Sequence, residues 1–593
     1  MGISYNDYEP TERKEREVEE TTSSGEELVL FFRSETQAQG FPKRDKRDKI
    51  KINGVEQFKP LEDLKYAQSF GFDYYRPDLY GSDTKIYEGG VATGHKLEDN
   101  FEIDNQLSLE LKNKKGKSKF IDNEFTLVNS SSSTNYKYFI PNLLVIKGKT
   151  ITFYAKYLCP DNTGVSAKIT LSDATGIDNY TQDVSFNKSE EIKPITITTS
   201  ASVNIAIATI LSITIEKEGV TTVIGKCNIL PNKQYEPNFI FIDVIYNSTI
   251  ASSTDYSKFV KNLNEKAFNQ AGINIVKSKN QYTLHLKPND ALRVTDSKEP
   301  IVNSNIVSNS INATNQITNF DNVLEIASYK FYEGIALKLM NEIEVELKKI
   351  KVKDKSKKDY PLIKTTESLE EIIKTKDGTN DEKQKRYNRL INNIIGFIKE
   401  SKINYLIGFM CSNLESVDDS IALGYLNTRG FIVSKSGTSD FMTCAHEIGH
   451  NFNLGHTFLK AGQVNDLQIP MTETLENIMD YLSGNPPPRK SFMAFQWFKM
   501  QKSLDRYAIS DKDIDTTSTG ILNGFNCLKD NTSNYLGSLN LYLKFFTYEI
   551  IRSIFLNIED SNKITLLHSD KDENDALNII SEIIKNTIKE LQS

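Results

Sequence analysis

Three of the six histidines in the chain fall within eleven residues, and this cluster is the part of the sequence best suited to chemistry. The side chains from Thr438 to Asp440 can cap a helix, so we predict a helix that starts there and runs through His450. His446 and His450 are four residues apart and would lie on one helix face, where two imidazoles can bind one metal ion. Glu447 lies off that face, and its carboxylate can reach a metal-bound water and act as a general base.

A third ligand requires the helix to end, and Asn453 is placed to end it. After glycine, asparagine is the residue that enters the left-handed backbone conformation most readily. His456 follows on the turning chain and completes a set of three imidazoles. Three nitrogen ligands with an open fourth position are typical of a catalytic zinc, whereas a structural zinc more often has four ligands, several of them cysteines. We therefore predict Zn²⁺ as a cofactor held by His446, His450 and His456.

These residues resemble the signature of the metzincin clan of zinc endopeptidases, His-Glu-x-x-His-x-x-Gly/Asn-x-x-His, with Asn453 in place of the commoner glycine. The clan also has a methionine-containing turn below the metal, and the sequence Asn-Ile-Met-Asp-Tyr at 477–481 is similar to it. The resemblance implies that Met479 forms a hydrophobic floor under the ligands. It also implies a catalytic role for Tyr481, because astacins and serralysins place a tyrosine near zinc here. The sequence ending at Phe458 is closer to pappalysins, so the subfamily stays open.

The resemblance extends over about residues 237–505 and implies a strand that binds substrate. In the clan, an edge strand before the active-site helix pairs with the extended peptide, and Ile421–Leu426 is the candidate here. Its central residues Leu423, Gly424 and Tyr425 would offer backbone donors and acceptors to a peptide. The alternative is that this segment is an interior strand.

Composition limits the other functions that this chain can have. The chain has 593 residues, of which 38% are hydrophobic and 25% charged, as in ordinary globular proteins. A net charge of −7 provides no electrostatic footprint for nucleic acid. No apolar stretch reaches the length of a transmembrane helix, so we expect no membrane-spanning segment.

The pattern of the sequence predicts a multidomain α+β protein. A serine run at 130–133 and the prolines at 231 and 237 mark boundaries. Short Ile-, Thr- and Val-rich stretches between them are typical of an immunoglobulin-like β-sandwich. The lysine-dense stretch 348–358 is expected to be an exposed loop. The predicted parts are a disordered acidic tail (1–26), a β-rich region (27–130), the sandwich (134–232), a metzincin-like zinc peptidase domain (237–505) with a helical insertion at about 322–402, and a helical C-terminal extension (511–593).

The function predicted from these features is that of a zinc-dependent endopeptidase acting on protein or peptide substrates, with Glu447 as general base. Metzincins generally work outside the cell that makes them, yet the N-terminus shows no secretory signal. We therefore expect a toxin or effector that is exported without a recognisable signal peptide, with a secretion or injection machinery as a partner. The alternative is a catalytically unused zincin fold that serves such an assembly as an interaction or structural component and binds through the sandwich.

Overall fold

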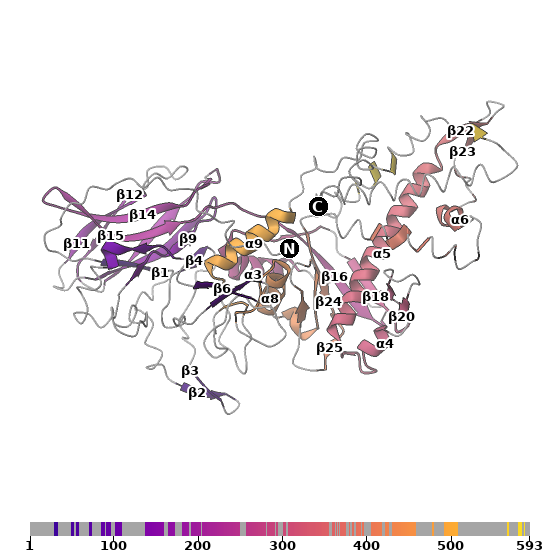
Figure 1. Cartoon of the computed structure of the whole chain (residues 1–593), viewed down its shortest axis with the longest axis horizontal. Helices are drawn as coiled ribbons and strands as arrows, with labels where there is room; N and C mark the ends of the chain where they lie inside the picture. Colours follow the sequence, from indigo (N-terminus) through magenta and orange to yellow (C-terminus); the bar gives the residue numbers. More distant parts are fainter. Residues whose placement is uncertain are drawn as a thin grey trace. The chain divides into compact units, whose positions relative to one another are not determined.

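The structure is a computed structural model, and it combines helices and sheets as the sequence predicts (Figure 1). It describes residues 29–33, 49–52, 55–58, 70–73, 85–88, 91–96, 101–108, 137–158, 164–171, 181–188, 191–202, 204–248, 256–279, 282–290, 292–294, 301–303, 306–354, 359–361, 405–417, 422–425, 430–439, 441–457, 477–479, 491–507 and 566–567, with short stretches or single positions between 363 and 395, at 428 and between 579 and 586. The expected acidic tail and Tyr481 lie outside these residues.

The chain divides into two compact units. The first comprises residues 1–236, 258–275 and 448–503, and the second comprises residues 237–257, 276–447 and 504–593. None of the described helices is long and apolar enough to cross a membrane.

The first unit contains two β-sheets that pack against each other. Rings from opposite sheets stack, with Phe72 against Phe153 at 6.2 Å and Tyr157 against Phe186 at 5.2 Å. One sheet has the order β1-β10-β13 and the other the order β12-β11-β14-β15-β9-β4. The strands are β1 (Val29–Arg33), β4 (Gly71–Asp73), β9 (Asn142–Leu144), β10 (Thr150–Leu158), β11 (Val165–Leu171), β12 (Thr181–Phe186), β13 (Ile192–Thr198), β14 (Thr209–Lys217) and β15 (Val220–Ile229).

Strands from the region before residue 130 complete both of these sheets. β1 pairs with β10 in antiparallel register and β4 pairs with β9. The sequence placed 27–130 and 134–232 in separate regions, because period-two patterning identifies strands but does not say which strands pair. In β13, Ile195 and Ile197 are buried while Thr196 and Thr198 are exposed, which is the alternation that a half-buried strand requires.

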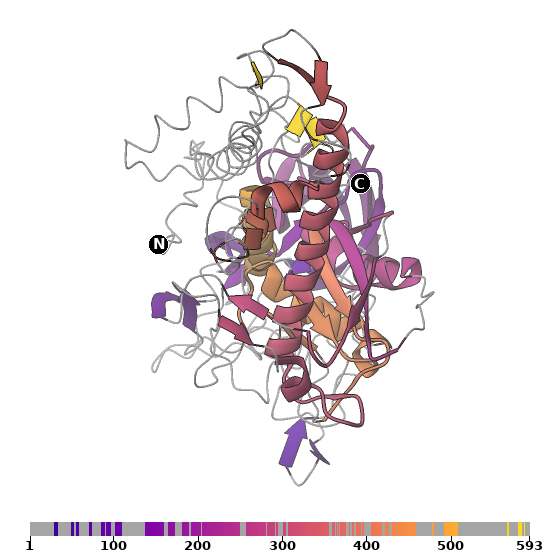
Figure 2. The same ribbon diagram turned by 90° about the vertical axis from the view of Figure 1, so that its right-hand side faces the viewer.

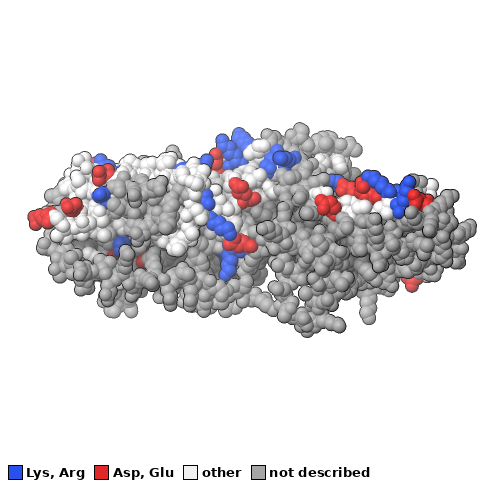
Figure 3. Space-filling model, turned by 90° about the horizontal axis from the view of Figure 1, so that it is seen from above, with Lys and Arg blue, Asp and Glu red and all other residues white. Residues whose placement is uncertain are grey.

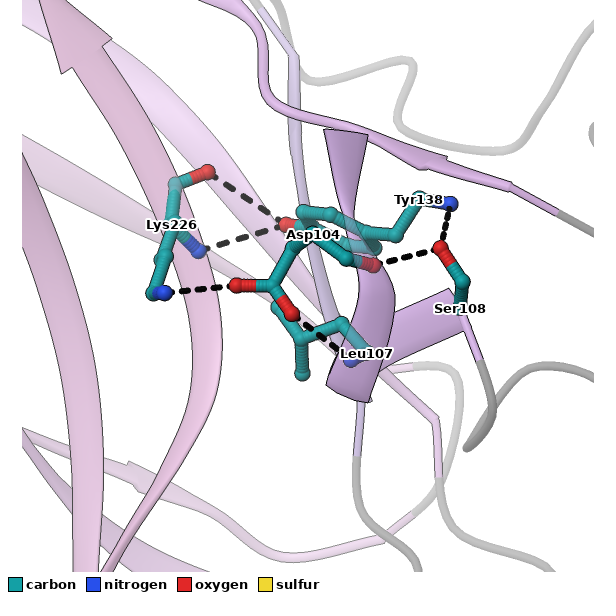
Figure 4. Close-up of polar contacts among 5 residues, drawn as sticks. All are labelled: Asp104, Leu107, Ser108, Tyr138 and Lys226. Atoms are coloured by element: carbon teal, nitrogen blue, oxygen red, sulfur yellow. Dashed lines mark hydrogen bonds and ion pairs between the residues drawn. The ribbon is translucent and has the colours of Figure 1, made fainter. Parts of the chain in front are cut away.

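A local network of polar contacts ties the segment around Asp104 to this unit (Figure 4). The Asp104 carboxylate accepts a hydrogen bond from the Leu107 amide at 2.8 Å and pairs with Lys226 Nζ at 2.5 Å. The Ser108 hydroxyl accepts from the Tyr138 amide at 2.8 Å. Asp104 ends strand β7 (Ile103–Asp104), which pairs with β8 (Tyr138–Phe139), so these contacts join three segments that are distant in sequence.

The second unit is built on a mixed sheet whose described strands run in the order β17-β16-β24-β27-β26, with β18 also paired to β16. All of these pairs are parallel except β26–β27. Every residue of β16 from Phe239 to Tyr246 is buried, as a strand covered on both faces requires. The strands are β16 (Asn238–Tyr246), β17 (Val276–Lys277), β18 (Tyr282–Leu286), β24 (Tyr405–Met410), β26 (Ala422–Gly424) and β27 (Gly430–Val433).

A long helix, α5 (Phe320–Leu347), runs alongside this sheet (Figure 2). The side chain of Asn319 accepts a hydrogen bond from the Asn322 amide and so caps its first turn. The helical insertion predicted at about 322–402 includes nearly all of α5. After α5 it contains α6 (Leu369–Lys374) and also the antiparallel pair β22 (Lys351–Asp354) and β23 (Asp359–Pro361). Strand β22 therefore occupies part of the lysine-dense stretch that we expected to be a loop.

The solvent-facing side of α5 carries acidic and basic side chains next to one another (Figure 3). Its opposite side contributes to the hydrophobic core of the unit. Ile580, from the C-terminal extension, is fully buried in the same core. In the described part of that extension, β28 (Leu566–Leu567) pairs with β22.

The remaining described elements are short. They are β2 (Lys49–Ile52), β3 (Val55–Phe58), β5 (Lys85–Glu88), β6 (Val91–Lys96), α3 (Ser257–Lys266), η4 (Phe268–Ala271), β19 (Leu292–Val294), β20 (Ile301–Asn303), α4 (Ile306–Ser310), β21 (Gln316–Ile317), β25 (Glu415–Ser416), η5 (Ser436–Ser439), α8 (Phe441–Asn451) and α9 (Ala494–Tyr507).

Candidate metal centre

Helix α8 carries two of the three clustered histidines. It begins at Phe441, directly after the short 3₁₀ turn η5, and ends at Asn451. Thr438 belongs to that turn, where its hydroxyl donates to the Lys435 carbonyl at 2.7 Å, so it lies before the helix. His446 and His450 stand one turn apart on α8, and both side chains are buried.

The end of α8 has the geometry of a Schellman motif. Asn453 has a φ of 72°, in the left-handed region. The Asn453 amide donates to the His450 carbonyl at 2.9 Å, and the Leu454 amide donates to the Gly449 carbonyl at 2.9 Å. These two bonds satisfy carbonyl groups that would otherwise be left open at the helix end. The chain therefore turns sharply at Asn453 and brings His456 back toward the helix.

Three buried histidines meet where the chain turns. One ring nitrogen of each of His446, His450 and His456 lies within 4.8 Å of the others, which is close enough for the three to hold a metal ion. The rings of His450 and His456 are 4.7 Å apart and perpendicular, at 88°. Perpendicular rings can direct nitrogen atoms toward a common point without stacking on each other.

A contact with the Leu454 carbonyl shows which ring nitrogen of His450 carries a proton. Its Nδ1 lies 2.7 Å from the Leu454 carbonyl oxygen, and because a carbonyl only accepts hydrogen bonds, Nδ1 carries the proton. In the neutral ring the lone pair is then on Nε2, where it can bind a metal. Hydrogen bonds of this kind orient the ring and strengthen it as a ligand. The same turn that ends α8 thus also orients one of its histidines.

Glu447 lies against the end strand of the sheet. A methyl group built on Gly424 would come within 3.1 Å of Glu447 Oε2 and 2.9 Å of its carbonyl oxygen. Gly424 is the last residue of β26, which ends the strand order among the described strands. The structure therefore brings the expected general base next to the strand expected to bind substrate. In that strand Leu423 is partly buried against the core, and Tyr425, the residue after the strand, is exposed.

Met479 packs against the helix between the two histidines of α8. A methyl group built on Gly449 would overlap Met479 Sδ, so only glycine permits this approach. Met479 is fully buried, and its carbonyl accepts from the Thr457 amide, next to His456, at 3.4 Å. The segment 477–479 thus lies beside the histidines, where the resemblance places it, although its role as the floor of a zinc site stays a prediction.

Three other polar residues lie near the site. Cys444 is buried, and its thiol lies 3.7 Å from the Gly437 carbonyl, so it is engaged away from the histidines. The buried amides of Asn477 and Gln496 bond to each other beside Met479, a contact that was not predicted from the sequence. The only signal in the sequence is that Gln496 lies three residues after Met493, the spacing of a capping box.

Comparisons with known proteins leave the site to be interpreted from its chemistry. No family model matches the chain, and no curated protein matches it either.

Proposed function

We propose that this chain is a zinc-dependent endopeptidase of metzincin type. The observation that supports it is the convergence of three buried histidines on a helix and the turn after it, with Glu447 on the next helical position. Three imidazole ligands with an adjacent carboxylate fit a catalytic zinc better than a structural one. A bound zinc would polarise the scissile carbonyl and lower the pKa of its water to about 7.

In this proposal residues of the chain transfer the proton, bind the substrate peptide and stabilise the oxyanion. Glu447 accepts a proton from the attacking water and passes it to the leaving amine. Backbone groups of β26, at Leu423 and Gly424, pair with the extended substrate peptide, because β26 ends the order of the described strands and an end strand can offer backbone donors and acceptors to a peptide. Tyr481 donates a hydrogen bond to the oxyanion that forms on the substrate.

The proposal also includes the fold of the two units, the substrates and the export of the enzyme. The two packed sheets of the first unit form an immunoglobulin-like sandwich, and residues 237–505 form a metzincin-like domain. The enzyme acts on protein or peptide substrates as an exported toxin or effector, and a secretion or injection machinery delivers it. The motif at 446–456 supports the peptidase, while the export route depends on the clan resemblance.

The test is metal analysis of the purified full chain combined with casein and peptide-library cleavage. We expect about one zinc per chain and hydrolysis that stops with a chelator and returns with added Zn²⁺. A chain that binds no metal would contradict the proposal. A chain that binds zinc and hydrolyses no peptide in the library would favour the alternative function, a zincin fold retained for binding.

A further inference from the structure

A reciprocal pair of buried amides connects the turn beside the histidines to helix α9. Asn477 Nδ2 donates to Gln496 Oε1 at 2.9 Å, and Gln496 Nε2 donates to Asn477 Oδ1 at 3.2 Å. Both side chains are buried, Gln496 completely. Buried amides stabilise a single arrangement only when they are paired, because an unpaired amide in the interior is costly. This pair therefore fixes the distance between the turn and α9.

Each amide also holds a backbone group on its own side of the pair. Asn477 Oδ1 accepts from the Met479 amide at 2.9 Å, and Gln496 Oε1 accepts from the Met493 amide at 2.8 Å. The second bond is half of a capping box, since Gln496 reaches back three residues to the start of α9. The Ile478 amide donates to the Ser491 carbonyl at 2.9 Å and adds a backbone link.

The turn held in this way places Met479 against Gly449, between the two histidines of the helix. A shift of Met479 would either open a gap under α8 or press on its backbone, since the two residues are already in contact. We propose that Gln496 is a positioning residue of the metal centre, acting through Asn477 and Met479 on the helix that carries His446 and His450. This inference depends on the metal centre of the proposed function.

The test is the affinity of the metal-free full chain for Zn²⁺, together with the absorption spectrum of its Co²⁺ form. Gln496→Met keeps the side-chain length and removes both bonds of the pair. We expect zinc binding about 10- to 100-fold weaker, the range found for residues that support metal ligands indirectly. We also expect the cobalt bands to shift at saturating Co²⁺, a change that a loss of stability alone would not cause.

A second variant, Asn477→Ser, removes the other amide of the Asn477–Gln496 pair and keeps a hydrogen-bond acceptor for the Met479 amide. In Asn477→Ser the hydroxyl can still accept from the Met479 amide, as in a serine turn, but it is too short to pair with Gln496. We expect the same direction of change in affinity and spectrum. In a Met479→Ala background, Gln496→Met should have little further effect, because both residues act through one contact.

The matched control lies on the same helix. Gln501 is also buried on α9, and its Nε2 donates to the Ala271 carbonyl at 2.7 Å. Gln501→Met should lower stability and leave zinc affinity and the cobalt spectrum as in the parent. If the parent binds zinc and both Gln496→Met and Asn477→Ser match it, the inference is wrong. If the parent binds no metal, the proposed function fails and the inference fails with it.

Discussion

Helices α8 and α5 bury different mixtures of side chains. Of the eleven residues of α8, five are buried polar ones: Thr443, His446, Glu447, His450 and Asn451. None of the buried residues of the 28-residue α5 carries a charge. Burial of polar groups costs free energy unless each is satisfied, whereas burial of apolar groups stabilises the fold. Two of the buried polar residues of α8, His446 and His450, belong to the histidine cluster, whereas no charged residue of α5 is fully buried.

The largest effect expected from this comparison is that of Glu447→Ala. The general base is lost while the three histidines remain, so proteolysis should fall at least about a hundredfold. Zinc content should be unchanged, because the three ligands remain. Cleavage of a reporter peptide and metal analysis check the two statements. Retention of more than about a tenth of the activity would contradict the role of Glu447.

The next largest effect concerns Tyr481, which lies outside the described residues. Tyr481→Phe keeps the ring and removes only the hydroxyl. If the hydroxyl stabilises the oxyanion, kcat should fall by about 10²–10³ with zinc binding unchanged. A tyrosine that merely fills the core would give turnover close to that of the parent, and steady-state kinetics separate the two cases.

Asn453 tests whether the turn after α8 serves the site. Asn453→Gly should be tolerated, because glycine enters the left-handed region freely. Asn453→Val forces a β-branched residue to a φ of 72°, at a cost of about 1–2 kcal/mol or more. Because the turn carries His456 and the carbonyl that orients His450, zinc affinity should fall about tenfold. Equal zinc affinity in the Val and Gly variants would mean that the site does not depend on this turn.

Features that depend on a few neighbouring residues could be predicted from the sequence. The grouping of the three histidines and the turn at Asn453 were predictable, because helix periodicity and a helix-ending residue act over a few positions. The closeness of the histidines in the structure follows from the same local rules. The role of Glu447 as general base stays a prediction. The mixed α and β content was predictable for a similar reason, since period two and period 3.6 are local patterns.

Contacts between distant segments were not predictable in this way. The pairing of Asn477 with Gln496 depends on the fold between them, and neither residue is unusual in sequence. The pairing of β1 with β10 likewise joins segments more than a hundred residues apart. Strand β22 was missed because its lysines match an exposed loop, and only its pairing with β23 and β28 makes it a strand.

We expect the smallest effect from removing a charge pair on the exposed face of α5. Lys338 Nζ is 3.7 Å from Glu342 Oε1, and both side chains are well exposed. Solvent screens such a pair, and a lysine placed before the glutamate runs against the helix dipole. Lys338→Ala and Glu342→Ala, measured singly and together by urea unfolding, should give a coupling free energy of no more than about 0.5 kcal/mol. Reporter-peptide cleavage and zinc binding should be unchanged in all three variants. A coupling well above 1 kcal/mol, or a loss of zinc, would mean that the polar face of α5 does more than keep the helix soluble, and the contrast with α8 would no longer hold.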